Sequence, residues 1–199
     1  RIDSLEAHQL LAELIKCRDW FWDDPELNSW GRFDSQAAHR EIVAKAFDHL
    51  GLDTQDIANQ IADWHTHEIE EALIPFPGAI ETVARIRDLG VKLALITNGG
   101  ASQRRKVEKF DLAPLFDCIV IEGEFGVGKP DERVYLHALD QLKVLAMEAW
   151  MVGDDLERDV AAPQRLGIFS IWLNSTGAGL PKSSTVLPDR IIRDVSKLL

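Results

Sequence analysis

Apolar side chains recur at helical spacing through the first 74 residues, which contain no convincing strand pattern. Residues 39–50 form one predicted helix, which Gly51 ends. Its apolar stripe consists of Ile42, Val43, Ala46, Phe47 and Leu50. A second helical pattern covers residues 57–73. The spacing therefore predicts a helical first part of the chain.

Two further segments of this part carry weaker signals. Ser4 is a candidate helix cap, because apolar residues follow it at helical spacing, at Leu10, Leu11, Leu14 and Ile15. Residues 19–34 gather Trp and Phe side chains among Asp, Asn, Pro and Gly. This composition fits either an aromatic-rich loop or short helices that pack through their aromatic rings.

The pattern changes at Pro75-Phe76-Pro77-Gly78, which fits a turn or hinge better than a helix interior. Beyond this point short apolar runs predict buried strands, and helical patterns separate them. The strands are expected at residues 91–97, 118–121, 149–152 and 169–173, and the helices at residues 79–89, 102–110 and 131–142 and from the third strand through Leu166.

Strands that alternate with helices in this way indicate βαβ units and a mostly parallel sheet. The predicted fold class is α/β, with a doubly wound, three-layer, Rossmann-like core at residues 75–199 and a small all-helical domain at residues 1–74. Ligands bind such sheets at the carboxyl ends of the strands. The residues that follow each strand are therefore the candidates for chemistry.

Two of these strand ends carry groups that suit a phosphate. Thr97-Asn98-Gly99-Gly100 offers a hydroxyl, an amide and glycines whose backbone N–H groups can approach an anion, although a capped turn explains the same residues. A glycine-rich loop, residues 122–130, follows the second strand and contains Lys129. A lysine there could neutralise a phosphate and a carboxylate together, and a surface turn is the alternative.

The third strand is followed by Gly153-Asp154-Asp155-Leu156-Glu157-Arg158-Asp159, which holds four acidic residues. Clustered carboxylates repel one another, and a hard divalent cation such as Mg²⁺ relieves that cost. An acidic helix N-terminus stabilised by the helix dipole explains the cluster equally well.

Together the segments LALITN, GKPDERVY and MVGDDLERD resemble motifs II, III and IV of the haloacid dehalogenase-like superfamily. The resemblance runs from about Pro75 to the C-terminus, and the helical first half looks like the cap domain that many members insert after motif I. It implies a magnesium-dependent phosphatase that acts on a small phosphorylated metabolite.

The resemblance also implies a role for each matching residue. Thr97 would bind the transferring phosphoryl group, helped by Asn98 and Gly99, and Lys129 would hold the phosphate and the carboxylate of the nucleophile. Asp154 would coordinate Mg²⁺ directly. Asp155 or Asp159 would assist through water or hydrogen bonds, with Asp159 slightly favoured.

One departure from the family pattern concerns the nucleophile. Members begin with a strand that ends in Asp-x-Asp, and no such motif precedes the helical part of this chain. The chain also opens at Arg1, within a helical pattern. We therefore expect a truncated sequence, and we expect the 199 residues alone to be inactive. A second departure is Pro163, which would kink the helix after motif IV if it lies beyond the first turn.

Two alternatives remain at this level. A 2-haloacid dehalogenase uses an aspartate nucleophile on carbon without metal, and the acidic cluster argues against it. A non-catalytic protein that keeps the fold without the nucleophile is the other alternative.

The composition of the chain limits the expected binding partners and the expected cellular location. The net charge of −11 argues against nucleic acid and anionic membranes as partners, because both attract basic surfaces. No apolar run approaches the ~18 residues of a membrane span, and no signal peptide is visible, so the cytoplasm is the expected location. The expected oligomeric state is a monomer or a homodimer. The two cysteines, Cys17 and Cys118, have no metal-ligand spacing and are expected to be free, buried thiols.

Overall fold

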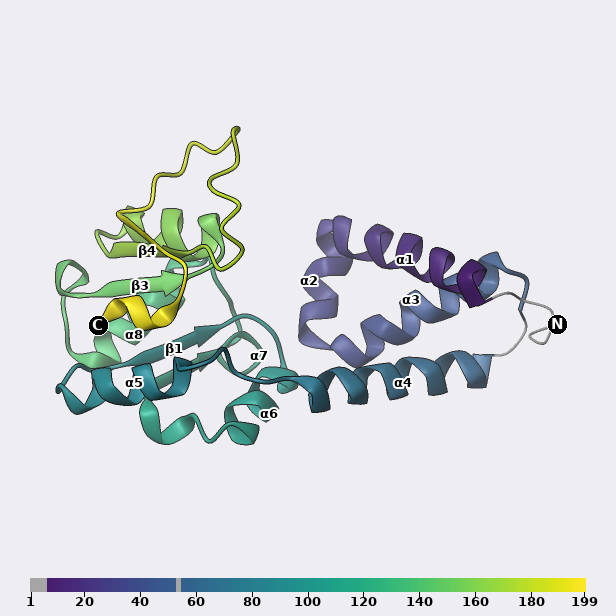
Figure 1. Cartoon of the computed structure of the whole chain (residues 1–199), viewed down its shortest axis with the longest axis horizontal. Helices are drawn as coiled ribbons and strands as arrows, with labels where there is room; N and C mark the ends of the chain where they lie inside the picture. The colour runs from purple at the N-terminus through teal and green to yellow at the C-terminus, as the bar shows by residue number, and fades with distance from the viewer. Residues whose placement is uncertain (1–6, 53–54) are drawn as a thin grey trace. The chain divides into compact units, whose positions relative to one another are not determined.

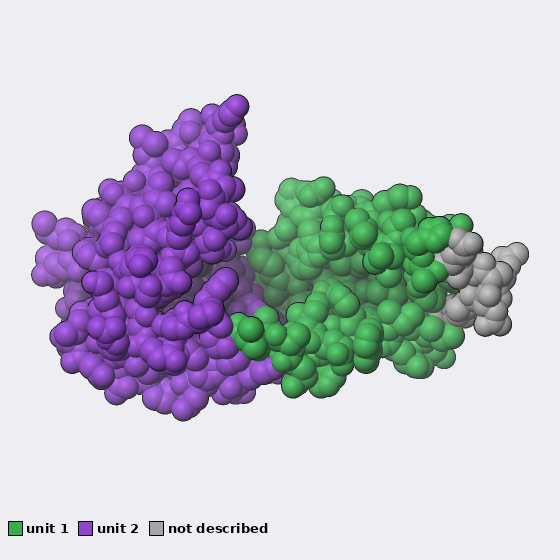
Figure 2. All heavy atoms as spheres, in the orientation of Figure 1, with its two compact units in different colours: residues 1–74 green, residues 75–199 purple. Residues whose placement is uncertain are grey.

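The computed structural model describes residues 7–52 and 55–199 (Figure 1), so the helix start predicted at Ser4 lies outside the described residues. The chain divides into two compact units, residues 1–74 and residues 75–199, which Figure 2 colours separately. The division falls at the Pro-Phe-Pro-Gly sequence. Within the described residues, no helix is both long and apolar enough to cross a membrane.

The described part of the first unit is helical. Its helices are α1 (Ala7–Asp23), α2 (Pro25–Phe33), α3 (Ser35–His49) and α4 (Gln55–Ala72). The aromatic-rich segment therefore forms helices rather than a loop. Asp24 caps α2 by accepting hydrogen bonds from two backbone N–H groups, and Pro25 occupies the first turn, where its missing N–H costs nothing.

The predicted apolar stripe of α3 forms much of the core of this unit. Ile42 and Ala46 pack with Cys17, and Val43 and Phe47 belong to a second cluster with Ala58 and Ala62 of α4. Leu50 is half-buried just beyond the helix, and Gly51 follows it with a φ of 64°, a value that favours glycine. The predicted end of the helix is confirmed.

The second unit contains parallel strands in two separate sheets. In the first sheet β1 (Ala94–Thr97) pairs with β2 (Cys118–Ile121), and in the second β4 (Phe169–Leu173) lies between β3 (Trp150–Gly153) and β5 (Arg190–Ile192). The helices are α5 (Ala79–Asp88), α6 (Ala101–Lys109), α7 (Glu122–Phe125), α8 (Glu132–Leu142) and α9 (Ala162–Arg165). Short 3₁₀ helices are Ala113–Leu115, Ala146–Glu148 and Val195–Leu198. The predicted α/β class with parallel pairing is confirmed.

Four local predictions need correction. The first strand begins at Ala94 instead of residue 91, because its partner strand begins only at Cys118, which pairs with Ala94. The expected loop after the second strand starts as the short helix α7. The expected helix after the third strand begins as a π-helix, Leu156–Ala161, and Pro163 lies in the first turn of α9. The sequence did not predict β5.

Among the described residues each sheet has two strand edges without a partner, at β1 and β2 in the first sheet and at β3 and β5 in the second. No described strand pairs with the second edge of β1 or of β3. All four positions of β1 are half-buried, and β3 runs from exposed to half-buried. In contrast, β2 and β4 are mostly buried. The strands that precede Asn98 and Asp154, β1 and β3, are thus more exposed than the strands with which they pair.

Candidate functional site

A pocket of about 340 Å³ lies at the carboxyl ends of the strands. It is lined by Asn98, Lys129, Asp154, Asp155, Arg158 and Asp159. Five of these six side chains are among those singled out in the sequence. They come from three loops that follow β1, β2 and β3, so the parallel topology brings together residues that are far apart in the chain.

An ion pair between Lys129 and Asp159 forms the most buried part of the pocket. The Lys129 Nζ lies 2.6 Å from the Asp159 Oδ1, and the two side chains are 13% and 4% exposed. The other carboxylate oxygen of Asp159 accepts a hydrogen bond of 3.0 Å from the backbone N–H of Asp155. Burial keeps such a pair from being screened by solvent, so the ammonium group is held in a fixed place.

Gly153 makes room for this arrangement. A Cβ atom at this position would lie 2.2 Å from the Asp159 Oδ2, far inside contact distance. The glycine at the end of β3 therefore has a packing reason, because it lets the Asp159 carboxylate fold back over the strand end toward Lys129.

Asp154 differs from its two acidic neighbours. Its residue is exposed, and its carboxylate makes no hydrogen bond or ion pair with any residue in 7–52 or 55–199. Its backbone carbonyl accepts a hydrogen bond of 2.8 Å from the indole of Trp172, which is 8% exposed. The backbone is thus anchored to β4 while the carboxylate stays available, and carboxylate oxygens suit a hard divalent cation.

Asp155 serves the local fold. It is the N-cap of the π-helix, and its Oδ1 accepts hydrogen bonds of 3.0 and 2.7 Å from the backbone N–H groups of Glu157 and Arg158. Its Oδ2 lies 3.0 Å from the Arg158 guanidinium. The explanation of the acidic cluster as a helix N-terminus therefore fits Asp155, whereas the Asp159 carboxylate pairs with Lys129.

Asn98 connects the first loop to the second. Its side-chain amide donates to the backbone carbonyl of Lys129, and its side-chain oxygen accepts from the Lys129 N–H, both at 2.7 Å. Since both ends of the amide are occupied, the side chain of Asn98 positions Lys129. The Thr97 hydroxyl is half-buried and donates over 3.3 Å to Gln103.

Glu122 is a buried residue that the sequence analysis missed. It is 7% exposed, and its carboxylate accepts a 2.8 Å hydrogen bond from the N–H of Gly99. The Gly99 N–H therefore donates to the Glu122 carboxylate, whereas the sequence analysis expected it to approach a substrate phosphate. The space that Glu122 occupies is kept open by Gly128, where a Cβ atom would lie 2.5 Å from the Glu122 carboxyl carbon.

Arg158 was also missed, because in sequence it is one more charge in an acidic helix. It lines the pocket and belongs to the π-helix, a form often found at functional sites. The backbone carbonyl of Arg158 accepts a hydrogen bond from the Tyr135 hydroxyl. Burial raises the pKa of Tyr135 above its usual range, so this hydroxyl remains a donor.

Comparisons with known proteins identify relatives of this chain. The profile of the haloacid dehalogenase-like hydrolase family matches residues 34–173. A glyceraldehyde 3-phosphate phosphatase of Methanocaldococcus jannaschii is 31% identical over 85% of this chain and 68% of its own. A phosphoserine phosphatase of Thermus thermophilus is 36% identical over 62% of this chain and 49% of its own.

A solved 2-haloacid dehalogenase from Pseudomonas syringae covers 96% of this chain and 82% of its own, with a TM-score of 0.64 and 28% identity. The chain thus resembles both phosphatases and a dehalogenase. It spans about half the length of several curated relatives that it matches. The extent of the profile match and the phosphatase relatives show that the chain belongs to the haloacid dehalogenase-like hydrolase family.

Proposed function

We propose that the protein is a magnesium-dependent phosphomonoesterase that acts on a small phosphorylated metabolite through an aspartyl-phosphate intermediate. The observation that carries this proposal is the buried Lys129–Asp159 pair beside the exposed carboxylate of Asp154. A fixed positive group and an available carboxylate line the same pocket. This combination suits an anionic substrate that binds together with a divalent cation.

Lys129 would bind the substrate. Its ammonium group is held by Asp159, and its backbone is held at both N–H and C=O by Asn98. A cation that is fixed in this way offsets the negative charge of a phosphoryl group without reorganising during the reaction. Thr97, at the end of β1, would donate its hydroxyl to the same group.

Asp154 would be the main protein ligand of Mg²⁺, since its exposed carboxylate has no other partner among the described residues. Mg²⁺ commonly takes one or two carboxylates and completes its shell with water and substrate phosphate, which fits a site with a single available carboxylate. When bound, the ion would offset charge on the transferring group. Asp159 would act through its hold on Lys129.

The nucleophile would be a carboxylate on a further strand between β1 and β3. Each of these strands has an unpaired edge among the described residues and is more exposed than the strand with which it pairs, as expected if one more parallel strand covers that edge. The carboxylate oxygen would bond to phosphorus while the ester P–O bond breaks and the leaving oxygen takes a proton. Water would then cleave the acyl phosphate.

The relatives support a phosphatase, because those at 31% and 36% identity are named for phosphatase activities. A second candidate is a 2-haloacid dehalogenase, which the 28% identical structure favours. The two differ in the bond that is cleaved and in the need for metal, so one experiment separates them.

The experiment incubates the full-length protein with a panel of small phosphomonoesters and, separately, with 2-haloacids. Phosphate and halide release are measured with Mg²⁺ and with a chelator. The proposal expects phosphate release that stops with the chelator and returns with Mg²⁺. Halide release at the same rate with and without the chelator would contradict the phosphatase proposal and support the dehalogenase.

A matched control uses the Asp140→Asn variant, because Asp140 is an exposed aspartate that pairs with Lys143 away from the pocket. This variant should keep the full rate and the full response to magnesium.

A further inference from the structure

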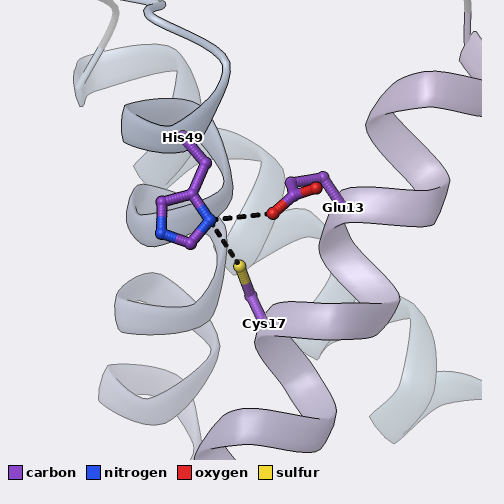
Figure 3. Close-up of side chains that lie close together, drawn as sticks. All are labelled: Glu13, Cys17 and His49. Atoms are coloured by element: carbon purple, nitrogen blue, oxygen red, sulfur yellow. Dashed lines mark hydrogen bonds and ion pairs between the residues drawn. The ribbon is translucent and has the colours of Figure 1, made fainter.

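Three potential metal ligands converge on the helical first unit. Glu13 and Cys17 lie on α1, and His49 is the last residue of α3 (Figure 3). The His49 Nδ1 lies 2.8 Å from the Glu13 Oε1 and 3.9 Å from the Cys17 Sγ. All three ligand atoms lie within 4.8 Å of one another. Figure 3 shows the imidazole facing both other side chains.

Packing explains why these groups meet. Glu13 and Cys17 are four residues apart, so they lie on one face of α1, one turn above the other. That face packs against α3, because Cys17 shares a core cluster with Ile42 and Ala46. His49 sits one turn beyond this contact, at the C-terminal end of the α3 dipole, where positive charge is favoured.

We propose that Glu13, Cys17 and His49 bind a zinc ion, with the fourth position open to water. A thiolate, an imidazole and a carboxylate are the ligands that Zn²⁺ takes in proteins, and three protein ligands with one open position is a common arrangement. Ligand atoms around a tetrahedral zinc ion lie about 3.4–3.7 Å apart. The observed separations bracket this value, so small side-chain rotations would suffice.

The charge and the exposure of the three side chains also favour a zinc ion. A thiolate and a carboxylate together balance the charge of Zn²⁺, and a neutral imidazole leaves the total at zero. Cys17 is 2% exposed, whereas the His49 side chain is 43% exposed, so the site has a buried sulfur and an open side through which an ion can enter. Desolvation raises the pKa of Cys17 and so keeps the thiol protonated. Binding should therefore release a proton.

The competing explanation is an ion pair without metal. His49 and Glu13 would form a surface salt bridge, which Lys16 extends at 3.0 Å from the other Glu13 oxygen. The thiol would then only fill space in the core. The two explanations differ in one measurable respect, because only the zinc site joins the sulfur to an ion.

The experiment uses the full chain and Co²⁺ as a spectroscopic substitute for zinc. The proposal expects a thiolate-to-cobalt charge-transfer band that Zn²⁺ displaces at one equivalent, and a thermal midpoint that rises with zinc. Cys17→Ser should remove the band, and His49→Gln should weaken zinc binding at least about tenfold. His49 is exposed, so its variant should fold even if the Cys17 variant does not.

Three controls locate the binding. Cys118→Ala removes the other buried thiol, His67→Gln removes another exposed histidine, and Asp154→Asn removes the available pocket carboxylate. All three should leave the cobalt band and the zinc affinity unchanged. A cobalt spectrum without the band would overturn the proposal. Equal zinc affinity in the parent chain and in His49→Gln would also overturn it.

Discussion

The pocket of the second unit and the Glu13–Cys17–His49 cluster of the first both gather charged groups, but they are built differently. In the pocket, loops at the ends of parallel strands carry Lys129 and Asp159, and a glycine makes room for their contact. In the cluster, two long helices present side chains from their faces. Asp159 of the pocket is buried and accepts a backbone hydrogen bond, whereas the His49 side chain is 43% exposed.

The difference shows how the two kinds of site tolerate change. A loop site depends on each backbone contact, such as that of Asn98 with Lys129, so single substitutions should have large effects. In the Glu13–Cys17–His49 cluster only Cys17 belongs to the hydrophobic core of the unit. Its exposed members can change without unfolding the unit.

The largest expected effect separates the two sites by function. Lys129→Met should lower the turnover number of the full-length protein about 10²–10³-fold, because the fixed cation beside the phosphoryl group is lost. His49→Gln should leave the turnover number unchanged. Steady-state phosphate release measures both.

Lys143→Met is the matched control, since Lys143 is an exposed lysine with its own aspartate partner. Urea unfolding of Lys129→Met would separate a loss of chemistry from the cost of leaving Asp159 buried and unpaired. An active Lys129→Met protein would refute the assigned role.

Gly153→Ala tests whether the pocket depends on backbone space. The new Cβ would meet the Asp159 carboxylate, so we expect the free energy of unfolding to fall by about 1–3 kcal/mol, together with a loss of activity. In a double-mutant cycle with Asp159→Ala, the loss of stability caused by Gly153→Ala should be smaller than in the parent chain, because two of the three closest atoms, the Asp159 Oδ2 and carboxyl carbon, are gone. Additive losses would show that the clash is not with Asp159.

Asp154→Asn tests the available carboxylate. The Mg²⁺ concentration for half-maximal activity should rise at least roughly tenfold, because the main protein ligand loses its charge. Thermal stability should stay the same, since the carboxylate has no partner among the described residues. If the Mg²⁺ concentration for half-maximal activity did not change, Asp154 would not be the main ligand of the metal.

The smallest effect concerns an exposed ion pair of the first unit, in contrast to the buried pair of the pocket. Arg40 and Gln36 lower the pKa of Asp63 from 3.8 to about 2. A lowered pKa contributes stability above the unfolded value and loses it as the pH falls through the folded value. The difference in urea midpoint between the parent chain and Asp63→Asn should therefore shrink as the pH falls from 3.8 toward 2.

The effect should be small, because the Arg40 and Asp63 side chains are 46% and 37% exposed and salt screens such a pair. Asp48→Asn, at an exposed position of the same helix as Arg40, provides the comparison. A difference that grows toward low pH would contradict the assigned cause.

The sequence predicted the pocket better than the cluster, for a physical reason. Asn98 and Asp154 directly follow apolar strands and Lys129 lies in the loop after another, and parallel pairing brings strand ends together whatever the loops contain. Glu122 stayed hidden because a glutamate at the start of a glycine-rich loop looks solvated. Only the packed loop shows that its carboxylate accepts from Gly99.

The cluster could not be predicted in this way. Cys17 has no metal-ligand spacing with the other cysteine, and its histidine neighbour lies 32 residues further along the chain. Their meeting depends on how α1 packs against α3, which helical periodicity does not fix. The π-helix at Leu156–Ala161 was missed for a similar reason, because a helical apolar pattern does not distinguish it from an α-helix.

The most direct test of the central claim is to trap the phosphorylated enzyme. The full-length protein is mixed rapidly with its best phosphomonoester, labelled on phosphorus, and quenched in acid. The account predicts label on an aspartate as an acyl phosphate that hydroxylamine removes, and loss of this label in Lys129→Met. Turnover that leaves the protein unlabelled at every quench time would contradict the account.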